Sequence, residues 1–343
     1  MKGRQIILGH QKRREIAVLL VNGRIEDCFV DPTEAKGPIP GAILRAKVGR
    51  PVKGQGSVFL ETPLGTAFLR GAKGLGPGQM ITVQVTALPE PGKAFPVTTR
   101  LLFKGRAAII TPHAPGINLS RSLSGDVERL RLHDAATTAM EGSEHGLIIR
   151  SAASELETDE IASEVTELRR VSKQVLAEVG DVPEILLAGP TSHELAWREW
   201  SKPVADAVTE NADGHDNAEI IEQLAEAAAV RQNLGKYGAF AFIEPTRAMV
   251  AVDVNTGPDT SPAATLKANL AIAEHLPRLL RLRGLGGQIA IDLAPLSKRD
   301  RPKFESSLRQ AFRQDPVETA LVGWTGLGHF ELQRKRERVP VLL

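Results

Sequence analysis

Two short apolar runs, each followed by an aspartate, form the clearest pattern of hydrophobic and polar positions in the chain. Residues 249–252 are apolar and rich in β-branched side chains, which predicts a buried strand, and Asp253 and Asn255 follow before a Gly-Pro break. A second run, residues 288–291, ends in Asp292. Alternate side chains of a strand share a face, and ligands of open α/β sheets bind at the carboxyl ends of strands. We therefore expect the three polar side chains to gather at one edge of a sheet.

The two carboxylates and the amide could serve either of two purposes. Together they offer oxygen ligands to Mg²⁺, a hard ion that prefers oxygen and keeps several waters. Asp and Asn also start turns, because their side chains hydrogen-bond to the nearby backbone. Asp253 and Asn255 alone favour the turn, and the second aspartate, Asp292, makes the two interpretations about equal.

Short strands separated by glycine and proline occupy residues 41–100. The predicted strands cover residues 42–48, 57–61, 66–69, 80–88 and 94–99. Five strands at this spacing, without a helical period, predict a small barrel of the OB type. Phe59 and Phe68 lie on neighbouring strands beside basic residues, where aromatic rings can stack on single-stranded nucleic acid. Either ring could instead fill the barrel core, and the pattern leaves both possibilities open.

The rest of the chain alternates predicted strands and helices, as in mixed α/β proteins. Strands are predicted at residues 4–8, 15–21, 25–30, 107–111, 146–150, 183–188, 238–243, 248–253 and 318–324, and helices at 127–137, 154–179, from 192, at 218–229, 261–283 and 300–313. Ser154 and Glu157 have the spacing of a capping box, and Pro277 is expected to kink its helix. Residues 211–216 form the clearest linker.

The single cysteine among 343 residues limits the cross-links that the chain can carry. Cys28 lies in an apolar stretch, where a core position is expected. Because there is only one cysteine, internal disulfides and a cysteine-built zinc site within one chain are excluded. The longest early apolar run, residues 16–21, is too short for a signal peptide or a membrane span. We therefore expect a cytoplasmic protein without a membrane partner.

The net charge of +2 conceals an uneven distribution of charge. Residues 41–106 carry ten Lys and Arg against two acids, and residues 276–343 carry thirteen against seven. Residues 151–228 carry eighteen acids against five bases. Separate basic blocks predict surfaces for a polyanion, although the basic segment 333–338 could simply be solvated. The acidic block is expected to be scaffold, because it would repel phosphates.

Four motifs together resemble the catalytic core of the ribonuclease E/G family. In order, they are Asp253-Val-Asn255, Ala268-Asn-Leu270, Arg281-Leu-Arg-Gly-Leu-Gly-Gly287 and Ile289-Ala-Ile-Asp292. The likeness extends along the chain and implies a multidomain α/β fold. It implies a ribonuclease-H-like scaffold at 1–38 and 180–216, an OB-fold RNA-binding domain at 39–103, a shortened 5′-phosphate sensor region at 104–179, and a deoxyribonuclease-I-like catalytic domain at 217–343.

The resemblance also implies roles for individual residues. Asp253 and Asp292 would bind Mg²⁺, with Mn²⁺ as a substitute, and Asn255 would orient the scissile phosphate. The RNA-binding positions fall on Phe59, Phe68 and Lys93. The 5′-phosphate sensor pair falls on Arg150 and Ser151, where Ser keeps the hydroxyl of the family's Thr, and two further pocket positions fall on Gly105 and Ile109.

The chain departs from the family pattern in several places. Arg247 stands where the family has Glu, Pro295 stands where it has a later Asp, and the sensor is shorter between Ser151 and Pro183. The two-cysteine zinc link and the small C-terminal domain have no counterpart in this sequence. These departures predict a reduced member that needs no zinc and is a monomer or weak dimer rather than the family tetramer.

The sequence therefore predicts a Mg²⁺-dependent endoribonuclease. It would cleave single-stranded RNA, in processing or decay of rRNA or mRNA, and leave 5′-phosphate and 3′-hydroxyl ends, as the resemblance implies. A rival hypothesis is a catalytically weak RNA-binding protein that keeps the fold, which Arg247 and Pro295 favour and the Asp/Asn/Asp trio opposes. A small-molecule phosphoesterase fits the trio but leaves the basic barrel unexplained.

Overall fold

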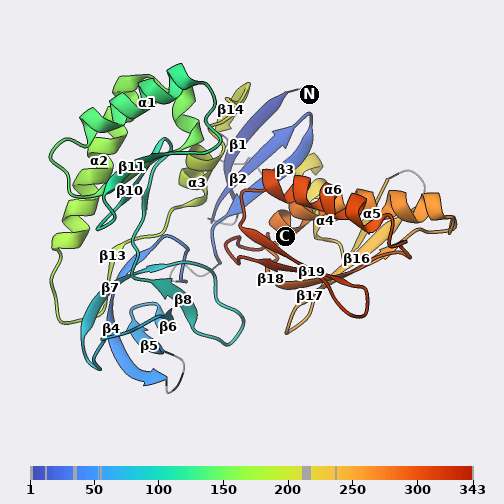
Figure 1. The fold of residues 1–343 in the computed structure, drawn as a ribbon, viewed down its shortest axis with the longest axis horizontal. Helices are drawn as coiled ribbons and strands as arrows, with labels where there is room; N and C mark the ends of the chain where they lie inside the picture. The colour runs from blue at the N-terminus through green and yellow to red at the C-terminus, as the bar shows by residue number, and fades with distance from the viewer. Residues whose placement is uncertain are drawn as a thin grey trace. The chain divides into compact units, whose positions relative to one another are not determined.

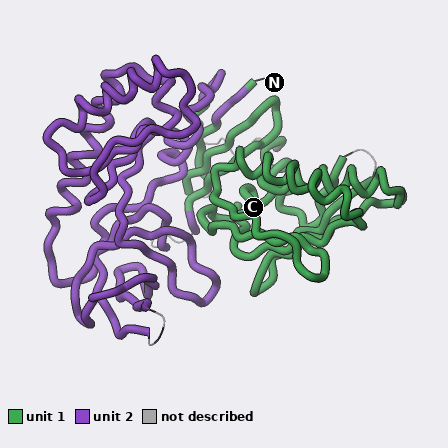
Figure 2. The backbone as a smooth tube through the Cα atoms, in the orientation of Figure 1, with its two compact units in different colours: residues 1–3, 7–31, 209–343 green, residues 4–6, 32–208 purple. Residues whose placement is uncertain are grey.

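A computed structural model describes residues 3–11, 14–33, 37–52, 54, 56–210, 218–235 and 238–341. The predicted linker at 211–216 lies outside these residues. The chain divides into two compact units, one of residues 1–3, 7–31 and 209–343 and one of residues 4–6 and 32–208 (Figure 2). The four-domain division and the weak assembly stay predictions.

A six-stranded sheet forms the centre of the first unit, with the order β15-β16-β17-β18-β20-β19. Its strands are β15 (Arg231–Asn233), β16 (Phe240–Pro245), β17 (Val250–Asn255), β18 (Gly287–Asp292), β20 (Phe330–Arg334) and β19 (Thr319–Trp324). Only β17 and β18 are parallel neighbours, and α5 (Pro262–Leu282) connects them. Helices α5 and α6 (Arg301–Gln314) pack together on one face of the sheet (Figure 1).

The alternation in β17 places its apolar and polar side chains on opposite faces. Val250, Val252 and Val254 are buried in the core shared with the helices, while Asp253 is exposed on the other face and Asn255 is partly exposed there. Helix α5 is aligned by its own capping: the Ser261 hydroxyl accepts a hydrogen bond from the Ala264 N–H at 3.2 Å, and proline occupies the first turn, where it suits a helix. Pro277 lies inside α5 without ending it.

A second sheet has the order β14-β1-β2-β3. Its strands are β14 (Ala207–Glu210), β1 (Arg4–Gln11), β2 (Arg14–Val21) and β3 (Arg24–Val30). The predicted Asn-Gly turn joins β2 and β3, and Asn22 and Gly23 both have positive φ, as such hairpin turns require. This hairpin packs with α4 (Ala218–Ala228) around a core that contains Cys28, which confirms the expected burial of the cysteine.

A closed five-stranded barrel confirms the prediction for residues 41–100. It consists of β4 (Ile43–Val52), β5 (Ser57–Thr62), β6 (Gly65–Arg70), β7 (Met80–Val85) and β8 (Phe95–Thr98). Antiparallel pairing of β4 with β7 closes the barrel, which is consistent with an OB-fold, and β13 (Glu184–Leu187) adds to β4 from outside. Small aliphatic side chains and Phe95 fill its core.

The other sheet of the second unit has the order β11-β12-β10-β9. Its strands are β9 (Phe103–Lys104), β10 (Ala108–Thr111), β11 (Gly116–Leu119) and β12 (Gly146–Ile149), and α1 (Asp126–Ala139) and α2 (Thr158–Ala177) pack on its core. The short helix α3 (Ser192–Glu199) follows β13. Among the described helices, none has the length and apolar character that crossing a membrane requires.

The predicted start of α2 is wrong by four residues. Residues Ser151–Glu155 form a 3₁₀ turn, η1, in which the Ser154 hydroxyl bonds back to the Ser151 carbonyl at 3.0 Å. Glu157 caps the helix instead, and its backbone N–H donates to the Glu160 carboxylate at 3.0 Å. Ser154 is therefore used in a local turn, a competing role that serine hydroxyls commonly take.

Candidate active site and RNA-binding residues

The structure brings the three predicted catalytic side chains together. Asp253 and Asp292 are direct register partners on the parallel strands β17 and β18. Asn255 lies two residues beyond Asp253 on the same face, and its side-chain amide donates to the Asp253 carboxylate at 3.0 Å. Both carboxylates are exposed, with 66% of the Asp292 side chain accessible. The arrangement is an edge with two carboxylates and one amide.

The electrostatic surroundings of this edge leave its negative charge largely uncompensated. Within the part of the chain that the structure describes, no Lys or Arg forms an ion pair with either aspartate, and the Nε2 of the His329 imidazole lies 3.6 Å from the Asp292 carboxylate. Among those residues no three His, Cys, Asp or Glu side chains form a ready-made metal cluster. Two carboxylates with water and substrate oxygens are the donor set that Mg²⁺ typically uses, so these residues fit such an ion.

His329 is a neighbour of the site that sequence reasoning missed. The hairpin between β19 and β20 holds it, because the Thr325 N–H donates to the His329 carbonyl at 2.8 Å and the His329 N–H donates to the Thr325 hydroxyl at 3.1 Å. Strand β20 pairs with β18 on the side away from β17, which brings His329 to Asp292. A lone histidine in a Gly-rich turn gives no sequence signal of this pairing.

Asn269 supports the site from within α5 and was also missed as a functional position. Its side chain is completely buried. The amide donates to the Ala294 carbonyl at 2.9 Å, and the amide oxygen accepts from the Ala294 N–H at 3.1 Å. This two-bond clamp fixes the segment immediately after Asp292, so the Ala268-Asn-Leu motif positions the second carboxylate.

The two predicted stacking residues lie side by side on the barrel. Phe59 and Phe68 are register partners on β5 and β6, with ring centroids 5.3 Å apart and planes inclined by 53°. Phe59 is 45% exposed and Phe68 is half-buried, and neither belongs to the barrel core. The alternative that these two rings fill the barrel core is therefore wrong. Lys93 is also exposed, and its ammonium pairs with the Glu90 carboxylate at 2.5 Å.

The predicted sensor residues lie around the end of β12. The Arg150 guanidinium donates to the Gly105 carbonyl at 2.7 Å and to the Glu199 carboxylate at 2.5 Å. A Cβ on Gly105 would lie 2.2 Å from the Glu164 carboxylate, so a larger residue there would displace the Glu164 side chain. Ile109 is half-buried in β10 opposite Ile148. Ser151 follows Arg150 at the start of η1.

Glu199, which the sequence did not single out, is the acidic partner of Arg150, and its side chain is mostly buried. Burial alone would raise the pKa of Glu199, but the guanidiniums of Arg150 and Arg198 and their hydrogen bonds lower that pKa below its usual value. Its carboxylate is therefore ionised at neutral pH and neutralises the arginine predicted to bind the 5′-phosphate.

Comparison with known proteins assigns the chain to a family. The model of the ribonuclease E/G family matches residues 103–228 and 193–337, more than half of the chain. The protein belongs to the ribonuclease E/G family. Ribonuclease G of Salmonella typhimurium is 27% identical over 95% of this chain and 79% of its own length, and ribonuclease G of Escherichia coli K12 is 26% identical with the same coverage. Ribonuclease E of Nostoc sp. strain PCC 7120 is 27% identical over 77% of this chain and 44% of its own length. These findings confirm the predicted family and enzyme class, an endoribonuclease.

Arg247 and Pro295, the two positions that depart from the family pattern, differ in their distance from the edge that carries Asp253 and Asp292. Arg247 lies in the turn that precedes β17, where the Thr246 hydroxyl accepts from the Met249 N–H at 3.1 Å. Three strand residues, about 10 Å, separate the start of β17 from Asp253, so Arg247 lies away from the carboxylates. Pro295 directly follows the segment that Asn269 clamps, and it is exposed.

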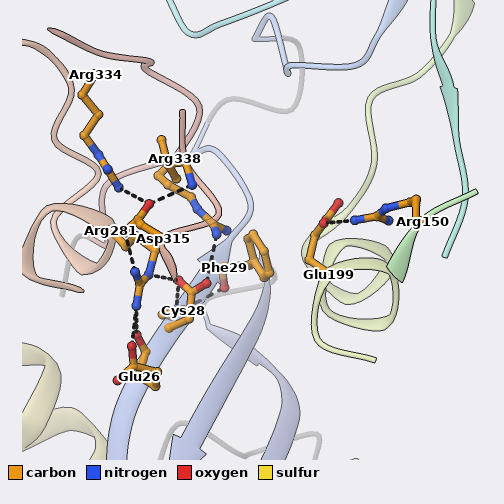
Figure 3. Close-up of polar contacts among 11 residues, drawn as sticks. Glu26, Cys28, Phe29, Arg150, Glu199, Arg281, Asp315, Arg334 and Arg338 are labelled. Atoms are coloured by element: carbon orange, nitrogen blue, oxygen red, sulfur yellow. Dashed lines mark hydrogen bonds and ion pairs between the residues drawn. The ribbon is translucent and has the colours of Figure 1, made fainter. Parts of the chain in front are cut away.

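Several basic residues that the charge pattern assigned to RNA surfaces are instead buried in ion pairs (Figure 3). Arg281, from the Arg-Leu-Arg motif, bonds to the carboxylates of Glu26 and Asp315 at 2.6 and 2.5 Å. Arg334 bonds to Asp315 at 3.1 Å, and Arg338 bonds to Asp27 at 2.9 Å. The segment 333–338 is therefore not a solvated tail, because two of its arginines hold unit 1 together.

Proposed function

We propose that this protein is a divalent-metal-dependent endoribonuclease that cleaves single-stranded RNA and leaves 5′-phosphate and 3′-hydroxyl ends. The observation that carries the proposal is the exposed edge where Asp253, Asn255 and Asp292 meet without a Lys or Arg partner in the described part of the chain. The proposal includes the finer fold assignment, with a ribonuclease-H-like scaffold at 1–38 and 180–216 and a deoxyribonuclease-I-like catalytic domain at 217–343.

The residues at this edge have distinct tasks in the proposed mechanism. Asp253 and Asp292 would hold Mg²⁺ or Mn²⁺, which supplies a Lewis acid that offsets charge on the phosphate. One N–H of the Asn255 amide donates to Asp253, and a side-chain amide has a second N–H, which is free to orient a non-bridging phosphate oxygen. Asn269 keeps the backbone after Asp292 in place.

The barrel would supply a binding surface for single-stranded RNA. Phe59 and Phe68 offer stacking faces, and Lys93 offers a positive charge to the backbone. Because phosphate contacts release counterions, affinity should fall as salt rises.

Replacing either barrel aromatic, as Phe59→Ala or Phe68→Ala, is expected to weaken single-strand RNA binding by about 1–3 kcal/mol, because each removes a stacking face. Fluorescence anisotropy with a labelled RNA measures the change. Neither ring belongs to the barrel core, so the melting temperature should change little. Unchanged affinity together with lost stability would assign the rings to packing.

The Arg150–Glu199 pair gives the sensor proposal a direct test. Glu199→Gln keeps the shape of the side chain and removes the competing charge, so affinity for 5′-monophosphorylated RNA should rise about tenfold, the value of one charge-assisted hydrogen bond of about 1.5 kcal/mol. RNA with a 5′-hydroxyl should bind unchanged. Glu155→Gln is the matched control, because Glu155 pairs with Lys202 at 3.6 Å and not with Arg150. A Glu199→Gln protein that does not distinguish the two RNAs would remove Arg150 as the sensor.

Incubation with a 5′-monophosphorylated AU-rich single strand, with and without Mg²⁺, tests the proposed function. Cleavage that stops after EDTA treatment and returns with Mg²⁺ or Mn²⁺ is expected, and the ends can be identified by enzymatic labelling. Binding without cleavage in any of these metals would favour the catalytically weak RNA-binding protein. Cleavage that persists in EDTA would remove the metal from the mechanism.

A further inference from the structure

Two phenylalanines on β16 have no role in the proposed mechanism. Ala241 and Ile243 point into the core and are fully buried, while Phe240 and Phe242 alternate with them and are half-buried. Neither ring belongs to the core that the sheet shares with α5 and α6. The same alternation places Asp253 and Asn255 on the face away from the helices, so the rings and the carboxylate share one side of the sheet.

The strand register connects these rings directly to the catalytic residues. Phe242 pairs with Asp253, and Phe240 pairs with Asn255. On the other side of β16, Arg231 pairs with Phe242. Neighbouring strands lie about 4.8 Å apart, so Phe242 lies one strand away from the first catalytic carboxylate.

The local geometry is that of a surface for flat groups. The Phe240 and Phe242 rings meet edge to face, with centroids 5.5 Å apart at 82°. The Arg231 guanidinium lies 4.1 Å above the Phe240 ring and donates to the Asn233 side chain at 2.7 Å. Aromatic faces and planar guanidinium groups are the elements on which proteins stack unpaired RNA bases.

We propose that Phe242, with Phe240 and Arg231, forms a stacking subsite for the base of the nucleotide next to the scissile phosphate. The inference rests on the proposed endoribonuclease function, because the catalytic edge defines which nucleotide is adjacent. The scissile phosphate lies at Asp253 and Asp292, and the neighbouring base lies over the Phe242 ring on the adjacent β-strand. The Arg231 charge faces the phosphate backbone of the bound RNA. This subsite is separate from the Phe59 and Phe68 pair, which belongs to the other unit.

A base-deletion experiment tests the contact. Binding is measured in an Asp253→Asn background with a short RNA in which one nucleotide at a time, across the whole strand, is made abasic. Phe242→Leu removes the aromatic face but keeps an apolar side chain of similar size, and it should weaken binding about 5- to 100-fold. At the nucleotide whose base occupies the subsite, the abasic change should cause a similar loss of RNA affinity when Phe242 is present. In the Phe242→Leu protein the same change should lower affinity less than twofold.

Two controls keep the result specific. Val322→Ala changes an exposed apolar residue on β19 of the same sheet and should leave binding of every RNA unchanged. Phe68→Leu should remove the abasic loss at a different nucleotide.

The proposal is overturned if the losses of RNA affinity are independent at every nucleotide. In that case the abasic change would weaken binding by the same factor with and without the Phe242→Leu substitution. The proposal is equally overturned if Phe242→Leu lowers the melting temperature while binding is unchanged, because the ring then only packs. The proposed function fails separately, if the wild-type protein does not cleave RNA in any divalent metal.

Discussion

Asp253→Asn is expected to lower the rate constant of RNA cleavage by about 10²–10⁴-fold, and Asp292→Asn should have an effect of the same size. Each change removes one of the two carboxylates proposed to bind the metal, which forfeits several kcal/mol of transition-state stabilisation, and about 1.4 kcal/mol corresponds to tenfold in rate. The two carboxylates are exposed and adjacent, so the folded structure should persist. Single-turnover cleavage of a 5′-monophosphorylated RNA measures the rate.

Glu244→Gln is the matched control for these variants. Glu244 is an exposed carboxylate in β16 and pairs with Ala251, two residues before Asp253. The Glu244→Gln protein should cleave RNA at the wild-type rate if activity depends on the positions of Asp253 and Asp292 and not on negative charge in general. RNA affinity should be within about threefold of wild type in all three variants. An Asp253→Asn protein that also cleaves within about threefold of the wild-type rate would make the aspartates structural.

Asp315→Ala is expected to lower the free energy of unfolding by about 3–5 kcal/mol, because it leaves buried guanidinium groups without their counter-charge. The Asp315 side chain is fully buried, and it bonds to Arg281 and Arg334, which are 6% and 1% exposed (Figure 3). It also accepts the Val317 N–H at 2.8 Å. Urea denaturation followed by circular dichroism measures the loss.

An exposed ion pair provides the comparison for this stability prediction. Glu167 and Arg170 pair on the surface of α2 with both side chains more than half exposed. Glu167→Ala should therefore leave the urea midpoint nearly unchanged, because water already solvates both charges. Equal shifts for Asp315→Ala and Glu167→Ala would show that the buried network contributes nothing beyond a surface pair.

The edge where Asp253, Asn255 and Asp292 meet could be predicted from the sequence because local rules determine its geometry. Alternation in β17 and β18 decides which side chains face the core, and a parallel pair brings two strand ends to one edge. The barrel was predictable for a similar reason, since glycine or proline lies in every connection between its consecutive strands. Neither inference needed a contact between distant residues.

The partners of the charged side chains could not be predicted in this way. Counting charges assigned Arg45 to an RNA surface, but it is 4% exposed and bonds to Glu184 at 2.7 Å. Glu199 and His329 likewise gain their importance from residues 49 and 37 positions away, Arg150 and Asp292. Composition describes how many charges exist, whereas the fold decides which of them meet.

The β2–β3 hairpin is synthesised early, but the helices that cover its apolar face are synthesised much later. Its apolar face packs on α4 and α5, and the Arg278 guanidinium reaches back over 253 residues to the Ile25 carbonyl at 2.5 Å. At a synthesis rate of about 5–20 residues per second, that partner appears roughly 10–50 s after the hairpin leaves the ribosome. During this time Ile16, Val18 and Cys28 have no completed core to enter. Nascent chains of this protein should therefore depend on holding factors until translation passes α5.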